Sequence, residues 1–243
     1  MKRLDGRVAV VTGASRGIGY AVATALAAEG AHVIAIARER SVGALEELDD
    51  DITRLGGAAT LVPLDLTDYP GIDRLGGAIH ERWGKLDILI GNAGLLGSLS
   101  PLSHLDPGEF ERVLAVNVTA NWRLIRSLEP LLKQSDAGRA IFVTSGAAVK
   151  MKPYWGLYGL TKAALEHLAL TWAAECDGSV LSVNLINPGP IRTGMRAKAM
   201  PGEDPDTLPR PADIAPLFVE MAAPDFAGNG ERVSFRDWRD QTA

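Results

Sequence analysis

The sequence predicts an α/β fold, in which a doubly wound parallel sheet of about seven strands carries helices on both faces. Three observations support this prediction. Short apolar runs rich in Val and Ile, typical of buried parallel strands, alternate with longer segments of helical composition. The first run, 8–11, leads into a turn with three glycines. Polar, glycine or proline residues follow each of the first six runs, at the sheet edge where such folds bind ligands.

The elements follow in order along the chain. Gly30 and Gly56 terminate the first two helices, and Pro107 suits the first turn of a long one. The expected strands are 8–11, 32–37, 59–64, 86–90, 140–144, 180–186 and 232–235. The expected helices are 20–29, 41–55, 69–83, 107–133, 155–175 and 212–221.

Residues 194–210 interrupt the alternation with three prolines, several charges and two methionines. We expect either a mobile lid over a ligand site or a plain surface excursion. Because there is no internal linker or repeat, residues 1–243 are expected to form one domain.

Composition excludes several classes of function. Hydrophobic residues make up 47% of the chain and charged residues 23%, which is ordinary for a globular domain. A net charge of −5, with the charges scattered, argues against nucleic acid or a membrane surface as partner. No apolar run reaches the ~20 residues of a membrane helix. The lone Cys176, and an N-terminus without room for a signal peptide, predict a cytoplasmic protein. We expect no metal site.

The glycine turn contains Gly13, Gly17 and Gly19 between a strand and a helix. Residues without side chains let a diphosphate approach the backbone, and a helix N-terminus offers free N–H groups. A tight turn without a ligand would also explain the glycines, so the turn alone does not establish a nucleotide site.

Ser145, Tyr158 and Lys162 are candidate catalytic residues. Tyr158 and Lys162 are four residues apart on an expected helix, so they share one face. A free tyrosine has a pKa of ~10, and a nearby ammonium lowers that pKa toward the working range of an acid–base catalyst. A serine hydroxyl donates to the oxygen of a reacting carbonyl. The alternative is an ordinary amphipathic helix surface, which the glycine turn and Ser145 together disfavour.

These motifs resemble those of the short-chain dehydrogenases/reductases, in their shorter single-domain branch with a Rossmann-like fold, over nearly the whole chain. Thr12–Gly19 is similar to the family's cofactor turn, and Asn117, Ser145, Tyr158 and Lys162 to its catalytic tetrad. The resemblance implies a Tyr acid/base, a Ser that polarises the carbonyl, a Lys that binds ribose, and an Asn that holds a proton-relay water. The implied cofactor residues are Gly13, Ser15, Arg16, Gly17, Ile18, Gly19, Arg38, Asp65, Leu66, Asn92, Ala93, Gly94, Tyr158, Lys162, Pro188, Gly189, Ile191 and Thr193.

Two positions depart from the family pattern. Gly91 stands where an Asn usually precedes the Asn-Ala-Gly motif, and the C-terminal Asp-Gly-Gly is missing. Within the family the sequence looks most like a bacterial subgroup without an assigned substrate.

NADP is the expected cofactor, with NAD possible. Ala37 and Arg38 stand where NAD-preferring members carry an acid, and an arginine there forks onto a 2′-phosphate. Arg16 is expected to reach the same phosphate, although both arginines are also compatible with solvated surface charges.

The expected function is NADP-dependent interconversion of a carbonyl and an alcohol. A 3-oxoacyl-[acyl-carrier-protein] reductase and a non-catalytic nucleotide-binding regulator are the alternatives. Beside Ser145 and Tyr158, we expect a small, mostly apolar substrate to meet Leu95, Leu96, Ala147, Val149, Met151, Trp155, Pro190, Met195 and Met200. A homodimer or homotetramer is expected, because small residues on the helix 155–175 allow close helix contact: Gly156, Gly159, Ala163, Ala164, Ala169 and Ala173.

Overall fold

Seven parallel strands form one sheet in the order β3-β2-β1-β4-β5-β6-β7 in the computed structural model, which describes residues 2–242. The strands are β1 (Val8–Thr12), β2 (His32–Ala37), β3 (Ala58–Pro63), β4 (Ile88–Gly91), β5 (Gly138–Val143), β6 (Leu181–Asn187) and β7 (Arg232–Ser234). The chain reverses its direction of winding between β3 and β4, which flank β2 and β1. The predicted fold class is confirmed, and the ligand edge is the one where the strands end.

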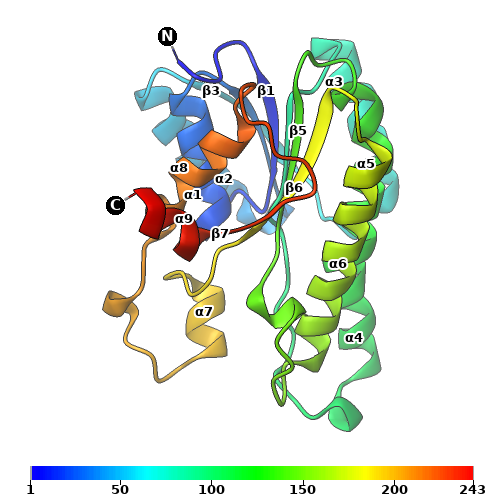
Figure 1. Cartoon of the computed structure of the whole chain (residues 1–243), viewed down its shortest axis with the longest axis vertical. Coiled ribbons are helices and arrows are strands. Elements are labelled where there is room, and N and C mark those ends of the chain that lie inside the picture. Colours follow the sequence, from blue (N-terminus) through cyan, green and yellow to red (C-terminus); the bar gives the residue numbers. More distant parts are fainter. Residues whose placement is uncertain (1, 243) are drawn as a thin grey trace.

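Alternate residues of each strand enter two separate cores, as the pleat requires. Ala9 and Val11 face one core, and Val8 and Val10 face the other. The first core is closed by α1 (Gly17–Ala28), α2 (Val42–Arg54) and α8 (Pro211–Ala222). The second is closed by α3 (Tyr69–Trp83), α5 (Ala120–Leu132) and α6 (Gly156–Glu175). Figure 1 shows these two helical layers on either side of the sheet.

The long helix expected at 107–133 is present but contains an irregular turn. It begins as α4 (Pro107–Leu114), where Asp106 Oδ1 accepts from the Glu109 N–H at 2.8 Å. A π-helical segment, η3 (Ala115–Thr119), then connects α4 to α5. Such single π turns insert an extra residue into a helix and recur at functional sites.

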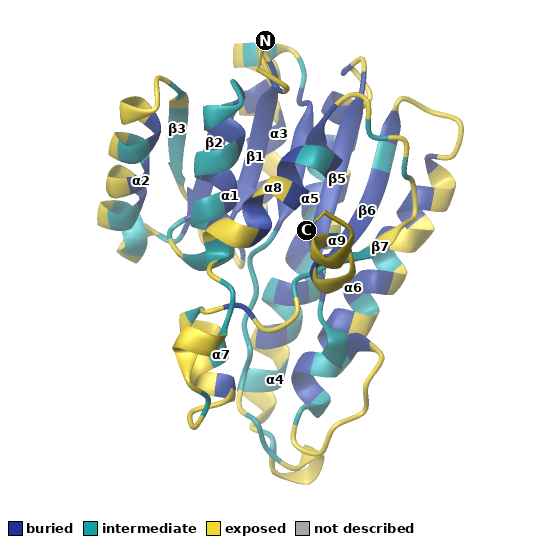
Figure 2. Cartoon of the chain, turned by 60° about the vertical axis from the view of Figure 1, so that its left-hand side comes forward, coloured by how far each residue is buried: buried dark blue, intermediate teal, exposed yellow. Residues whose placement is uncertain are grey.

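The C-terminal part differs from the prediction. β7 ends at Ser234, and the chain continues as α9 (Phe235–Thr242), for which the polar sequence gave no clear signal. The helix is held by the buried Phe235 ring and by Trp238, whose Nε1 donates to Glu220 Oε2 at 2.9 Å. The segment 194–210 contains α7 (Gly194–Ala199) and the short helix η5 (Pro205–Thr207), and α7 is mostly exposed (Figure 2). Its mobility as a lid stays a prediction.

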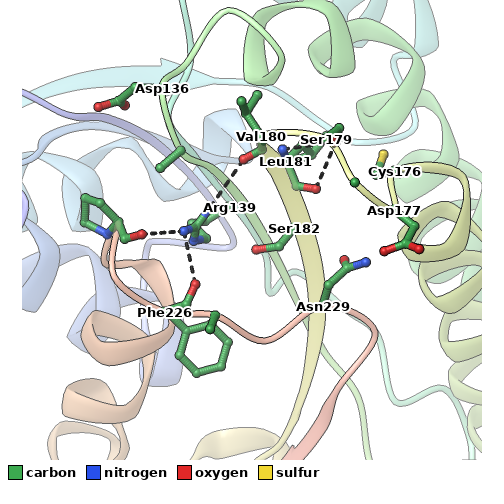
Figure 3. A pocket seen from close by; sticks show the side chains of 14 residues that line it. Asp136, Arg139, Cys176, Asp177, Ser179, Val180, Leu181, Ser182, Phe226 and Asn229 are labelled. Carbon is green, nitrogen blue, oxygen red and sulfur yellow. Dashed lines mark hydrogen bonds between the residues drawn. The ribbon is translucent and has the colours of Figure 1, made fainter.

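The opposite edge of the sheet, where β5 and β6 begin, holds a cavity of about 390 Å³ (Figure 3). Arg139 is buried there, and burial together with the charge of Arg7 lowers the pKa of its guanidinium. Among the residues that the structure describes, its N–H groups donate only to main-chain carbonyls: Gly138, Val180, Ala223, Pro224 and Phe226. Arg139 therefore clamps three chain segments together. Within residues 2–242, no helix has both the length and the apolar character needed to cross a membrane.

Candidate active site

The turn between β1 and α1 is covered by segments that follow β4 and β6. Gly13 has a φ of +68°, in the left-handed region that glycine adopts without strain. A Cβ on Gly19 would overlap the Gly13 carbonyl oxygen and lie 2.5 Å from Asn92 Nδ2. A Cβ on Gly17 would lie 3.4 Å from Thr193 Cγ2. The structure therefore brings together cofactor residues predicted at three different strand ends.

Hydrogen bonds of Thr12 hold this arrangement. Asn92 Nδ2 donates to the Thr12 carbonyl at 2.9 Å, and the N–H groups of Asn92 and Ala93 both donate to Thr12 Oγ1 at 3.0 Å. The Thr12 hydroxyl donates to the Ile90 carbonyl at 3.2 Å. α1 itself begins at Gly17 without a side-chain cap, so its first N–H groups can meet an anion.

Gly91, the departure from the family pattern, has a packing explanation. A Cβ there would lie 2.7 Å from Phe142 Cε1 and 3.0 Å from Asn121 Oδ1. The fully buried Phe142 ring occupies the space that a side chain at position 91 would need. With glycine at position 91, Asn92 still donates to Thr12 through its N–H and its side chain.

Three other arginines act on the charge of Arg38, which follows β2; we call Arg16, Arg38, Arg40 and Arg112 the arginine cluster. Burial lowers the pKa of Arg38, and the positive charges of Arg40, Arg16 and Arg112 lower it further, whereas Asp65 opposes them. Like charges held together cost free energy that a bound anion recovers. The sequence predicted Arg16 and Arg38 here but missed the other two. Arg40 is two residues beyond Arg38, whereas Arg112 comes from α4 and left no signal in the sequence.

The other predicted cofactor residues include polar groups at the ligand edge and buried side chains that pack beneath that edge. Asp65 Oδ1 accepts from the N–H and the hydroxyl of Thr67 at 2.9 and 2.8 Å. Burial acts to raise the pKa of Asp65, but these bonds and the neighbouring arginines outweigh it, so the pKa is lowered. Leu66 and Ile191 are buried in the two cores, where their side chains support the edge. The residues that complete the predicted set follow the ends of the strands β1, β4 and β6: Ser15, Ile18, Gly94, Pro188 and Gly189.

Asn117 lies fully buried in the π-helical segment. Its Oδ1 accepts from the Leu95 N–H at 2.7 Å, and its Nδ2 donates to the Leu95 carbonyl and to Thr161 Oγ1, both at 2.9 Å. A Cβ on Gly94 would lie 3.4 Å from Asn117 Oδ1 and 3.5 Å from Lys162 Nζ. These contacts place Asn117 close to Lys162, while the relay water stays a prediction.

Tyr158 and Lys162 lie on consecutive turns of α6, with Nζ 5.8 Å from the centre of the tyrosine ring. Lys162 Nζ donates to the Val143 carbonyl at 2.8 Å. Burial raises the pKa of Tyr158 to about 12, with a Ser145 hydrogen bond opposing. Burial lowers the pKa of Lys162 to about 8, with the charge of Glu166 opposing.

These values correct one expectation. Burial, and not the Lys162 ammonium, dominates the pKa of Tyr158, so its hydroxyl is protonated at neutral pH. A protonated phenol beside Ser145 suits donation of a proton to a carbonyl oxygen.

A hydrogen-bond network behind Ser145, formed by the buried Thr144 and Glu166 and the exposed Arg232, escaped the sequence reasoning. Glu166, one turn beyond Lys162, accepts from Thr144 Oγ1 at 2.5 Å and from Arg232 Nε at 2.8 Å. A second nitrogen of Arg232 donates to the Ser145 carbonyl at 3.3 Å. The network ties β7 and α6 to the backbone of Ser145. Its only signal in the sequence was the i, i+4 spacing of Lys162 and Glu166.

A cavity of about 320 Å³ opens beside Ser145. Ser145 and Trp155, two of the predicted substrate residues, line it. Tyr158 packs edge-on against Trp155, with ring centres 6.1 Å apart. The lining does not include Tyr158, which lies against Trp155, or the predicted substrate residues Leu95, Leu96, Met195 and Met200.

The lining is less apolar than the sequence predicted. Ala147 and Pro190 contribute as expected, but Lys150, Lys152 and Arg196 line the same cavity. Of the apolar residues expected there, Val149 and Met151 are not part of the lining and leave 51% and 90% of their surfaces exposed. The cavity therefore has a basic side that the prediction of an apolar site did not include.

Residues 7–204 match the family model of the short chain dehydrogenases. The chain belongs to this family. The resemblance inferred from the glycine turn and the tetrad is thereby confirmed.

Two relatives and one solved structure illustrate the similarity. An uncharacterized oxidoreductase, YciK, of Escherichia coli (strain K12) is 38% identical over 224 residues, which are 91% of this chain and 88% of that protein. The rhamnolipids biosynthesis 3-oxoacyl-[acyl-carrier-protein] reductase of Pseudomonas aeruginosa is 35% identical over 238 residues, 90% of each chain. A short chain dehydrogenase of Escherichia coli CFT073, solved in complex with NADPH, is 36% identical with a TM-score of 0.92 and covers 97% of this chain and 98% of its own.

Proposed function

We propose that this short chain dehydrogenase interconverts a carbonyl and an alcohol by hydride transfer with NADP(H), and that Tyr158 is its acid and base. The observation that carries the proposal is the position of Ser145, Tyr158 and Lys162. All three lie at the sheet edge that also holds the glycine turn and the arginine cluster. Hydride and proton would thus reach one substrate from two sides of the same site.

The residues at the cofactor end fit NADP. The crowding of a Cβ at Gly19 leaves room only for backbone, and the α1 N-terminus is open to a diphosphate. The arginine cluster supplies positive charge that a 2′-phosphate would neutralise, and no acid follows β2 directly to repel it. One relative of the same fold solved with NADPH and another solved with NADP support this choice. NAD is expected to bind more weakly.

The chain's own residues supply the rest of the chemistry, since the bound cofactor provides only the hydride. The Ser145 hydroxyl donates to the carbonyl oxygen and Tyr158 gives that oxygen its proton. Lys162 then stabilises the phenolate with its ammonium, and Asn117 holds the path by which the proton is replaced. Carbonyl, NADPH and one proton yield alcohol and NADP⁺. Ala147, Trp155 and Pro190 offer the body of a small substrate an apolar surface.

Purified protein should oxidise NADPH in the presence of small aldehydes or ketones. Tyr158→Phe should lose about 10²- to 10⁴-fold in kcat while retaining NADPH affinity, because only the transferable proton is removed. Tyr69→Phe, which removes a hydroxyl from α3, is the matched control and should stay active. A Tyr158→Phe protein with more than a tenth of the original kcat would exclude the acid/base role.

Reduction of a 3-oxoacyl group on a carrier protein is a second candidate. It is favoured by the similarity to the Pseudomonas aeruginosa reductase and by the basic side of the cavity. Carrier proteins are acidic, so their reduction should be efficient at low salt and weaken steeply as salt screens the charges. Rates of reduction of acetoacetyl thioesters, measured with and without the carrier and compared with the rates for small ketones, separate the two candidates.

Self-association through α5 and α6 completes the proposal. Four of the six small residues on α6 have partners within the chain, since Gly156 meets Leu102, Gly159 meets the Ala147 carbonyl, and Ala169 and Ala173 are buried. The support for a dimer or tetramer comes instead from apolar side chains left exposed on the two helices: Trp122, Leu160 and Leu170. A monomeric mass in light scattering at micromolar concentration would exclude it.

A further inference from the structure

The basic side of the substrate cavity contains two lysines without an acidic partner. Lys150 and Lys152 line the cavity and form no ion pair with any side chain of residues 2–242. The third cation, Arg196, is held by both of its fork nitrogens against Glu203, at 2.5 and 2.6 Å. In the described part of the chain, no aspartate or glutamate is part of the lining. Two solvent-exposed lysines without a carboxylate partner among the described residues therefore lie along the cavity, in a chain whose net charge is −5.

Backbone hydrogen bonds fix the main-chain positions of both lysines. The Lys150 N–H donates to the Gly146 carbonyl at 3.0 Å, one residue after Ser145, and the Trp155 N–H donates to the Lys152 carbonyl at 3.2 Å. Lys152 Nζ lies 5.8 Å from the centre of the Trp155 ring. Both lysines therefore lie on the short segment between Ser145 and α6, which begins at the proposed catalytic serine.

The same segment contains a strained residue. Tyr154 has a φ of +73°, which is the left-handed region and is uncommon for a residue with a side chain. Its carbonyl accepts from the Ser100 N–H at 3.1 Å, so the conformation is held from outside the segment. Strain of this kind costs about 1–3 kcal/mol and persists where surrounding contacts impose it, often beside a binding site.

We propose that the substrate of this site carries an anionic group, a carboxylate or a phosphate, which Lys150 and Lys152 bind while its carbonyl meets Ser145 and Tyr158. The proposal rests on the proposed carbonyl chemistry and narrows its substrate class. The volume of about 320 Å³ suits a small oxo acid or a phosphorylated carbonyl compound. The arginine cluster at β2 is a separate positive region, available for the cofactor, so the lysines are not needed there.

The test compares two aldehydes, 4-formylbenzoate and its methyl ester, which differ in charge and by one methyl group. The double variant Lys150→Met/Lys152→Met should raise KM for 4-formylbenzoate about five- to tenfold and change KM for the ester less than twofold. Lys2→Met removes the same charge at the amino-terminal end of the chain and should leave both KM values unchanged. In the unaltered protein, KM for the carboxylate should rise with salt concentration while that of the ester stays constant.

A binding measurement separates this inference from the carbonyl chemistry. Calorimetric titration of the enzyme–NADP⁺ complex with benzoate and with benzamide needs no turnover. Tighter binding of benzoate than of benzamide that disappears in the double variant supports the inference even if no aldehyde is reduced. A failure to reduce any aldehyde would instead refute the proposed reaction. Equal binding of benzoate and benzamide, or equal KM values in the variant and unaltered enzymes, would overturn the inference.

Discussion

Replacing Gly19 by alanine tests the glycine turn most directly. An alanine Cβ would lie 2.5 Å from Asn92 Nδ2, where an ordinary contact is about 3.5 Å, and it would overlap the Gly13 carbonyl oxygen. Relief therefore requires a shift of about 1 Å between α1 and the segment after β4. Overpacking on this scale costs about 1–3 kcal/mol.

This cost falls on the part of the turn that is proposed to hold the cofactor diphosphate. If this whole cost is subtracted from the free energy of NADPH binding, the dissociation constant of NADPH rises about 5- to 150-fold. Quenching of tryptophan fluorescence by NADPH measures that constant, and a thermal melt in the same buffer reports whether the protein is folded.

Gly77→Ala is the matched control. Gly77 lies on α3 with nothing within 4 Å of its Cβ position, so the same added methyl group meets only solvent. Because alanine is the better helix former, this variant should gain about 0.5–1 kcal/mol of stability and bind NADPH unchanged. A folded Gly19→Ala protein with unaltered NADPH affinity would refute the assignment of this turn to the cofactor.

Three further predictions concern charge. The pKa of Lys162 is about 8 in the folded protein against 10.5 in an unfolded chain, so between these pH values the unfolded chain binds the extra proton and this residue adds stability as pH rises. Urea unfolding at pH 7.5 and 10 should show this gain in stability for the unaltered protein and not for Lys162→Met. Glu166→Gln should move the gain to lower pH, because the charge of Glu166 opposes the lowering of the Lys162 pKa. Ala37→Asp combined with Arg38→Leu should turn the preference from NADPH to NADH, and equal titration curves of both cofactors with the unaltered protein would contradict the assignment. Arg139→Met should lower the free energy of unfolding by about 2–4 kcal/mol in urea titrations, because several carbonyls lose their hydrogen-bond donor, and should leave NADPH affinity unchanged. A loss below about 0.5 kcal/mol would show that water replaces the arginine as donor.

The sheet was predictable because its signals are local. A buried parallel strand is a short apolar run, and the residue after it lies at the ligand edge whatever the rest of the chain does. Gly19, Asn92 and Ser145 could therefore be placed before any contact was known. α9 could not, because its support comes from Phe235 and Trp238 packing onto distant parts of the chain and not from helical composition.

The site was predictable where its residues share an element, as Tyr158 and Lys162 do. It was not predictable where charge converges from separate elements. Arg112 joins the arginine cluster from α4, and Arg232 reaches the backbone of Ser145 from β7. The direction of the pKa of Tyr158 was also misjudged, because spacing reveals a neighbouring ammonium but not the depth of burial.

The π-helical turn around Asn117 makes the length of the segment 107–132 critical. A π turn accommodates one extra residue within a helix, so deleting one residue from η3 would return it to an ordinary α-helical turn and remove the bulge that contains Asn117. Asn117 would then lose its hydrogen bonds with Leu95 and Thr161. The exposed stretch around Gly202, by contrast, has room to lengthen at small entropic cost. Insertions and deletions should therefore be tolerated between α7 and α8 during divergence of this enzyme, and eliminated between α4 and α5.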